Sequence, residues 1–289
     1  MCCDGCASST PGRADKVRYV GVEYYFTGLL AYNAVQSYVA GSAPDRLTEL
    51  CDNLGPITPK GDISAWVKGI TDKQPFIDHA QRVYDLVAGL PHRPGDQAHA
   101  VAVQHARQIM WFYVHYSLSD ADALVYRDAR AAKNLRWWQE FSGDKVAYWA
   151  ALPHTANAPD MRHTPDMRFP SVGSYLRRWY GQLYLSIGFT FDHGTISFGS
   201  GQTLTQPPPA PDWFEQPLAS VRVDQFAVDL RQPAPPPVWR WLHALIKTRG
   251  QPSVGLDSIT TGGSVAQWFD LIIHRQRVTP AGTGWQSMG

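Results

Sequence analysis

Two short apolar runs separated by a loop and a helix constrain the fold of this chain more than any other feature of its sequence. The first run covers residues 145–153 and the second covers residues 183–191. Between them lie a polar loop with three prolines, residues 155–170, and a segment of helical character, residues 171–180. This pattern is typical of a β-α-β unit, whose two strands lie parallel in one sheet. We therefore predict an α/β fold with a mostly parallel sheet flanked by helices.

His154 directly follows the first of these predicted strands. In open α/β sheets, ligands bind at the edge formed by the carboxyl ends of the strands. That position favours a functional role for His154, but a single histidine in a loop is more often a residue without one. From its position alone, both interpretations stay open.

A long helical region precedes the β-α-β pattern. Apolar residues recur at helical spacing through residues 62–142, and acidic or hydroxyl residues precede its first and last segments. This predicts a helical bundle inserted into the α/β fold. We therefore expect a flexible tail over residues 1–16, an α/β core formed by residues 17–61 and 143–289, and a helical module over residues 62–142.

The composition excludes several classes of function. Hydrophobic residues make up 44% of the 289 residues and charged residues 18%, which is typical of a globular protein. The net charge of +1 indicates neither a nucleic-acid partner nor a membrane-surface partner. The apolar runs are far shorter than the roughly 20 residues that span a bilayer, and the chain starts without the apolar core of a signal peptide. We expect a cytoplasmic location.

The sequence gives no metal site that can be argued from spacing. Cys3 and Cys6 have the spacing of zinc or redox cysteines, but a second pair does not follow. The histidines within residues 62–142 lack the His-Glu-x-x-His pattern of zinc hydrolases. We therefore expect neither a metal nor a cofactor.

Several segments resemble the erythromycin esterase family, in the same order along the chain. Residues 148–156 resemble its Trp-Ala-His-Asn-x-His strand end, and residues 127–135 resemble its Arg-Asp-x-x-Met-Ala-x-Asn helix. Other similar segments are its second strand, which ends in a functional Glu, its Gly-x-x-Leu-Arg helix, its Ile-Gly-Phe-x-Phe-x-x-Gly strand and its closing strand, at residues 17–23, 172–177, 184–194 and 269–281.

The resemblance implies an activity and a set of site residues. The family hydrolyses cyclic esters, such as macrolide lactones, by means of a water molecule that a histidine activates. A macrocyclic or other apolar small molecule is therefore the expected partner. The resemblance implies catalytic roles for His154 and Glu23. The substrate-binding residues that we expect are Tyr24, Arg127, Asp128, Trp149, His163 and His193.

Two departures from the family pattern bear on activity. The family's first strand ends in Gly-Glu-x-x-His-Gly, and this run is missing here. In addition, Ala151 and Leu152 stand where the family has the first His and the Asn of the Trp-Ala-His-Asn-x-His pattern. Because losing a general base costs about 10²- to 10⁴-fold in rate, three alternatives stay open. The chain is a hydrolase in which His154, His163 or His193 acts as the base, a repurposed member (a binding protein, lyase, dehydratase or cyclase of secondary metabolism), or a truncated product.

Overall fold

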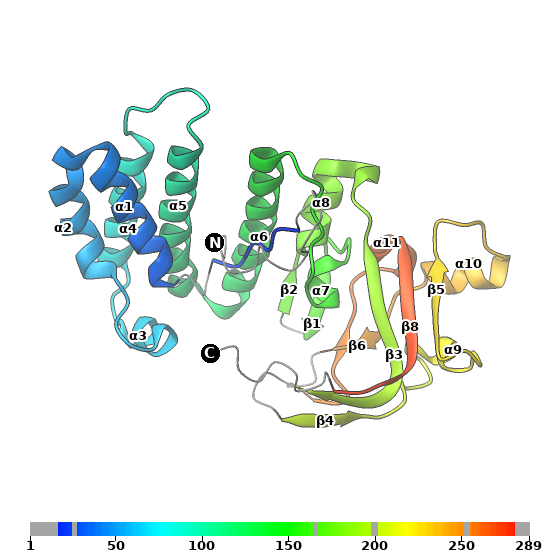
Figure 1. Cartoon of the computed structure of the whole chain (residues 1–289). Coiled ribbons are helices and arrows are strands. Elements are labelled where there is room, and N and C mark those ends of the chain that lie inside the picture. The colour runs from blue at the N-terminus through cyan, green and yellow to red at the C-terminus, as the bar shows by residue number, and fades with distance from the viewer. Residues whose placement is uncertain (1–16, 25–27, 165–166, 198–201, 251–254, 281–289) are drawn as a thin grey trace. The chain divides into compact units, whose positions relative to one another are not determined.

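The computed structural model describes residues 17–24, 28–164, 167–197, 202–250 and 255–280. The predicted tail, residues 1–16, lies outside these ranges, together with three of the four cysteines. The chain divides into two compact units, Met1–Gly143 and Asp144–Gly289, and each is described by itself (Figure 1).

The first unit is helical, as predicted for residues 62–142. Three of its helices begin at a capping residue, since the side chains of Asp62, Asp96 and Ser119 each accept a hydrogen bond from a backbone N–H of the following first turn. Gly143 ends the last helix with a φ of 71°, a left-handed conformation that favours glycine. The elements are α1 (Leu29–Ser42), η2 (Pro44–Arg46), α2 (Leu47–Ile57), α3 (Ile63–Gly69), α4 (Gln74–Ala88), α5 (Gln97–Ser117) and α6 (Asp120–Ser142).

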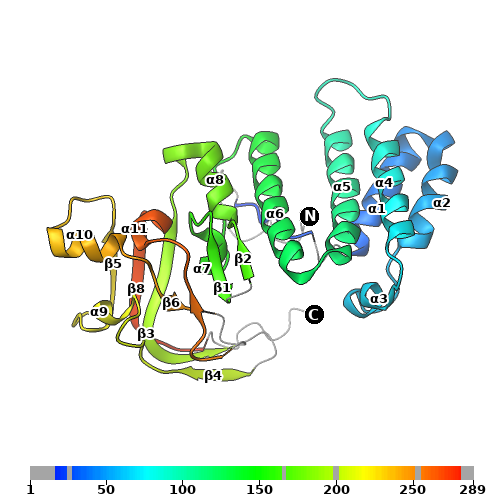
Figure 2. The same cartoon turned by 180° about the vertical axis from the view of Figure 1, so that it is seen from behind.

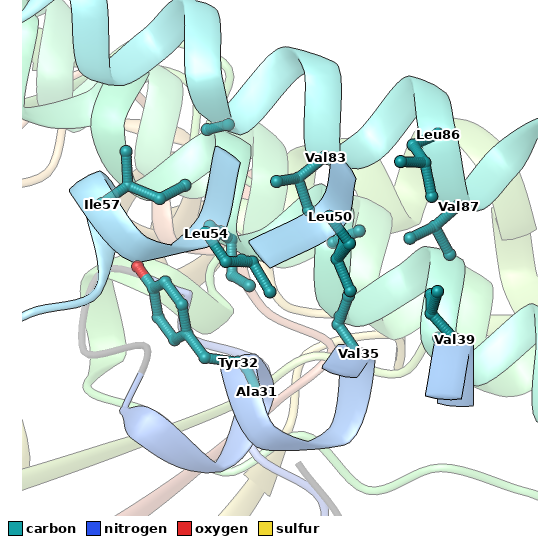
Figure 3. Packing of buried hydrophobic residues seen from close by; sticks show 14 of the residues in the cluster. Ala31, Tyr32, Val35, Val39, Leu50, Leu54, Ile57, Val83, Leu86 and Val87 are labelled. Atoms are coloured by element: carbon teal, nitrogen blue, oxygen red, sulfur yellow. The ribbon is translucent and has the colours of Figure 1, made fainter. Parts of the chain in front are cut away.

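One apolar core joins α1, α2, α4 and α5. Val35 from α1, Leu50 from α2 and Val83 from α4 are all fully buried and lie side by side (Figure 3). The sequence-based division assigns residues 17–61 to the α/β part, whereas α1 and α2 pack here against α4 and α5. Of the strand expected at residues 17–22, the structure has a single bridge residue, Val20.

The second unit combines three small sheets with short helices (Figure 2). Its larger sheet has the strand order β4-β3-β8-β5, in which β3 and β8 are parallel and the two outer strands are antiparallel to their neighbours. The elements are α7 (Leu152–Thr155), β1 (Met161–Thr164), β2 (Met167–Phe169), α8 (Val172–Tyr180), η3 (Gly181–Leu183), β3 (Ile187–Ser197), β4 (Thr203–Gln206), α9 (Gln216–Ala219), β5 (Gln225–Asp229), α10 (Pro236–His243), β6 (Thr248–Arg249), β7 (Ile259–Thr260), α11 (Val265–Trp268) and β8 (Leu271–Val278).

The fold is mixed α/β, but the prediction of a mostly parallel sheet is wrong. In the part of the chain that the structure describes, β3–β8 is the only parallel pair. A parallel neighbour requires a crossover of a dozen residues or more, whereas β4 follows β3 after a short connection and therefore pairs with it as a hairpin.

The strand predicted for residues 145–153 is also absent. Residues 144–151 form neither helix nor strand, and the chain then enters the helical turn α7. Pro153 lies in the first turn of α7, where its fixed φ and missing N–H are tolerated. The helix α8 and the strand β3 that follow are confirmed. Gly173 lets α8 approach the end of α7, because a Cβ at this position would overlap the carbonyl oxygens of Thr155 and Ala156.

Of the helices within the described ranges, none has both the length and the apolar character needed to cross a membrane.

The core of the helical unit gives a first prediction. Replacing Leu50, which is fully buried, by Ala leaves a cavity and should lower the free energy of unfolding by about 2–5 kcal/mol. The matched control is Leu30→Ala in α1, whose side chain is 62% exposed and should cost less than about 1 kcal/mol. Urea unfolding followed by circular dichroism measures both, and equal costs would contradict the packing described for α1, α2 and α4.

Candidate functional site

The residues that the sequence singled out fall into both units. Glu23, Tyr24, Arg127 and Asp128 belong to the helical unit, and Trp149, His154, His163 and His193 belong to the second unit. Each group has its own local geometry.

An ion pair joins Glu23 to Arg127 across 104 positions of sequence. The Arg127 guanidinium donates from Nε to Oε2 at 3.1 Å and from Nη2 to Oε1 at 2.9 Å. Both side chains are partly buried, with exposed fractions of 23% for Arg127 and 30% for Glu23. This two-pronged geometry is the strongest form of arginine–carboxylate contact. Since both carboxylate oxygens are engaged, Glu23 is held in one orientation and suits a positioning role better than that of a mobile base.

Tyr24, the next residue, lies at the centre of an aromatic cluster. Its side chain is fully buried, and its hydroxyl lies 3.1 Å from Nδ1 of His115 on α5. Burial, followed by the neighbouring Tyr126, raises the pKa of Tyr24 above its ordinary value, so the phenol keeps its proton at neutral pH. Burial, followed by the positive charge of Arg127, lowers the pKa of His115. A neutral imidazole and a protonated phenol therefore lie beside the ion pair.

The sequence analysis missed the residues that complete this cluster. On α5, Trp111 lies edge-on to the ring of Tyr24 at 5.9 Å, and His115 follows Trp111 by one helical turn. On α6, the guanidinium of Arg130 lies 4.1 Å from the ring centroid of Tyr126. Both pairs have i, i+4 spacing, which places their members on one face of a helix. That spacing is visible in the sequence, but nothing in it ties these faces to Glu23.

The remaining residues of the family-like helix fix the backbone before Glu23. Asn134 donates from Nδ2 to the carbonyl oxygen of Val22 at 2.7 Å and accepts from Gln104 Nε2 at 2.5 Å. Asp128 is 1% exposed, which makes it a buried residue of α6 and disfavours direct contact with a substrate. Helix α6 therefore holds the segment of residues 22–24 by side chains at two points, Arg127 and Asn134.

In the second unit, His154 lies on the helical turn α7, not at the end of a strand. Its ring centroid is 6.3 Å from that of Phe169 on β2. Trp149 precedes it in the irregular stretch and is 86% exposed, with its ring 5.5 Å from Phe189. These two aromatic side chains offer an apolar surface that water covers in the free protein.

The other two predicted histidines differ in burial and partner. His163 on β1 is 8% exposed and lies 2.9 Å, at Nδ1, from the hydroxyl of Thr260. That environment is typical of a structural histidine. His193 on β3 keeps 44% of its side chain exposed, and its Nδ1 lies 2.7 Å from Oδ2 of Asp192.

A cavity of about 210 Å³ lies within the helical unit. Its walls are mostly apolar and include Trp137 and Trp138, whereas Gln104, His105 and Asn134 supply polar atoms. A more open hollow of about 350 Å³ shares His105 with it. Burial lowers the pKa of His105 to about 4, so this imidazole is neutral at pH 7. Apolar walls with a few polar groups are typical of small-molecule sites.

The described residues contain no cluster of three or more His, Cys, Asp or Glu side chains that is able to hold a metal ion.

Comparison with known proteins identifies the family. The family model described as erythromycin esterase matches residues 8–278. The chain belongs to the erythromycin esterase family. No curated protein matches it.

Three solved structures have the same fold as this erythromycin esterase family member. A Bacillus cereus protein is 20% identical with a TM-score of 0.79, and the match covers 94% of this chain and 69% of that one. A succinoglycan biosynthesis protein is 23% identical with a TM-score of 0.75, and the match covers 92% and 66% of the two chains. A mutant of the erythromycin esterase EreC in its open conformation is 14% identical with a TM-score of 0.68, at coverages of 91% and 69%. At these identities the likeness concerns the fold alone.

The Glu23–Arg127 pair gives a second prediction. A double-mutant cycle with Glu23→Gln and Arg127→Met should show a coupling energy of about 1–3 kcal/mol, because each substitution leaves a partly buried charged group without its partner. Urea unfolding of the four proteins measures it.

The control for this cycle is the Arg136–Glu140 pair of α6, whose side chains are 48% and 56% exposed. An exposed i, i+4 pair should give only about 0.3–0.5 kcal/mol. A coupling between Glu23 and Arg127 no larger than this would show that the pair does not fix the segment around Glu23.

His105 gives a third prediction, on stability against pH. An unfolded histidine titrates near 6.5 and the folded His105 near about 4, so the unfolded state binds more protons between these values. The native state should therefore be destabilised as the pH falls from about 6.5 to about 4, and His105 should contribute nothing to this slope above that window.

The variant His105→Gln removes the titrating group. Between pH 7 and pH 4.5 the wild-type chain should lose about 1–3 kcal/mol more stability than the variant. Denaturant titrations at a series of pH values test this, and parallel curves for the two proteins would refute it.

Proposed function

We propose that this protein is a hydrolase that opens a cyclic ester of the macrolactone type by means of a histidine-activated water molecule. Membership of the erythromycin esterase family supports this proposal. The observation that carries it is the Glu23–Arg127 ion pair, because it ties together two segments that each resemble the family and sets a neutral His115 and a protonated Tyr24 beside them.

The proposed chemistry divides between a base and groups that hold the substrate. In this proposal a histidine removes a proton from water, the oxygen attacks the ester carbonyl, and the C–O bond to the alcohol breaks. The imidazolium then returns its proton to the departing alkoxide, which yields a hydroxy acid. His154 stabilises the oxyanion or orients the water molecule. Glu23, held by Arg127, has a positioning role within its own unit.

Contact with the rest of the substrate falls to residues of the second unit in this proposal. Trp149, at 86% exposure, and the adjacent Phe189, at 52%, provide apolar surface that suits a macrocycle. His193, whose side chain is 44% exposed, completes the proposed binding residues of this unit. Opening a macrolactone in this way would inactivate a macrolide antibiotic.

A specific observation favours a second candidate function, that of a ligand-binding protein without catalysis. The cavity of the helical unit is lined by Trp137 and Trp138 and has few polar groups. Its volume of about 210 Å³ suits a small apolar molecule better than a macrolactone.

The fourth prediction separates these two functions. Purified protein incubated with erythromycin and with smaller lactones should convert at least one of them to its hydroxy acid, detected by mass spectrometry as the addition of one water. His154→Ala should lower kcat/KM by about 10²- to 10⁴-fold and leave binding of the lactone, measured by calorimetry, unchanged.

The matched control is His243→Ala, because this exposed histidine of α10 bonds only a backbone carbonyl, that of Trp239, at 2.8 Å. It should behave like the wild-type chain. Binding of a small apolar molecule without product at any pH would favour the ligand-binding alternative and contradict the hydrolase.

A further inference from the structure

A histidine and an aspartate on β3 form a hydrogen-bonded pair, of which the proposed function uses only the histidine, and only for binding. Nδ1 of His193 lies 2.7 Å from Oδ2 of Asp192. The two side chains differ in burial, since His193 is 44% exposed and Asp192 only 14%. Because an ionised carboxylate only accepts hydrogen bonds, Nδ1 carries the proton of this bond. In the neutral imidazole, Nε2 then keeps its lone pair and is able to accept a proton.

We propose that His193, oriented by Asp192, is the histidine that acts as general base in this protein's ester hydrolysis. This inference rests on the proposed function. It assigns His193 to proton transfer, and Asp192 to a positioning role through the imidazole. A base in hydrogen-bond contact with a third group that orients it is a recurring arrangement in hydrolases on unrelated folds.

Arg249 bonds the backbone of the aspartate of this pair. The guanidinium of Arg249 donates from Nη2 to the backbone carbonyls of Asp192 and Pro207, the latter at 2.6 Å. Its carbon atom Cζ lies 4.8 Å from the ring centroid of Phe191 and 5.5 Å from that of Trp213. Arg249 therefore holds the backbone of β3 at Asp192. It also places a positive charge near the carboxylate of Asp192.

The backbone of β3 is also constrained directly after His193, at Gly194. Gly194 has a φ of 130°, which favours glycine, and a Cβ there would overlap the backbone of Val278 on β8. His193 itself is paired with Arg277 in the parallel β3–β8 register. An imidazole on a rigid strand, with its neighbours fixed before and after it, is preorganised in the way that catalysis requires.

Three other histidines of the second unit lack one of the two properties that a base needs. His163 and His274 bond the hydroxyls of Thr260 and Thr190 and are only 8% and 0% exposed. His243 is exposed, but its Nδ1 bonds a backbone carbonyl. His193 combines a carboxylate partner with an exposed ring.

The chemical step balances without a co-reactant other than water. Nε2 of His193 takes a proton from water while the water oxygen bonds to the carbonyl carbon of the ester. The tetrahedral adduct then collapses, the C–O bond to the alcohol breaks, and Nε2 gives the proton to the leaving oxygen. One ester and one water become one acid and one alcohol, and Asp192 stays a carboxylate throughout.

The test combines substitution with chemical rescue. The full-length protein is assayed with 4-nitrophenyl acetate and with the lactone that it opens. His193→Ala should lower kcat by about 10²- to 10⁴-fold with little change in KM. Millimolar imidazole should restore part of the loss, because the site is exposed enough to admit it. Rescue by free imidazole is expected of a lost base and not of a structural residue.

Two further variants sharpen the result. In Asp192→Asn the amide would donate to Nδ1 and leave the ring proton on Nε2, so kcat should fall by about 10²-fold or more without rescue by imidazole. His243→Ala should keep wild-type activity. Circular dichroism of each variant checks that the chain is folded.

Each other outcome counts against the inference. If His193→Ala keeps its kcat, or loses activity only through KM, His193 binds substrate and is not the base. If His154→Ala alone is inactive and is rescued by imidazole, the proposed function stands and the His193–Asp192 pair is not its base. If the wild-type chain hydrolyses neither ester, the proposed function fails, and this inference fails with it.

Discussion

The parallel pairing of β3 with β8 is the interaction on which the second unit depends. It runs in register from Ile187 opposite Leu271 to Gly194 opposite Val278. At its centre Nδ1 of the buried His274 lies 2.9 Å from the hydroxyl oxygen of the buried Thr190. The antiparallel strands β4 and β5 add to this pair from either side. Because β3 is hydrogen-bonded to β8 and β4, the backbone that carries Asp192 and His193 keeps one conformation.

The helical half of the fold could be predicted from sequence because its signals are local. Asp62, Ser119 and Gly143 mark helix ends through contacts within a few residues. The strand expected before His154 fails for the opposite reason. A short apolar run such as residues 145–153 reads equally as strand, as irregular chain or as a helix entrance, and only its long-range partners decide. Pro153 supplied the one local hint of a helical turn.

The candidate site shows the same limit. Glu23 and Arg127 were both singled out, but their contact spans 104 residues and required the folded chain to be seen. His115 was set aside with the other histidines of residues 62–142 because they lack the His-Glu-x-x-His pattern, and nothing in the sequence distinguishes the one whose ring meets Tyr24. Asp192 and His193 are adjacent in sequence, but the arginine that bonds the Asp192 backbone, Arg249, lies 57 residues away. The sequence therefore indicated which residues were candidates, but it did not predict which of them contact one another in the folded chain.

The way in which α6 holds the segment before Glu23 has a consequence for motion. Residues 17–24 contain almost no regular secondary structure, and Arg127 and Asn134 anchor them through side chains to Glu23 and to the Val22 carbonyl. Such a segment opens at a cost far below that of the whole unit, since few backbone hydrogen bonds break with it. Amide exchange at these residues should then be governed by local opening, whereas the amides of α4 and α5 exchange only on unfolding of the core. Glu23 therefore lies on a segment whose opening requires only that its side-chain contacts with α6 break.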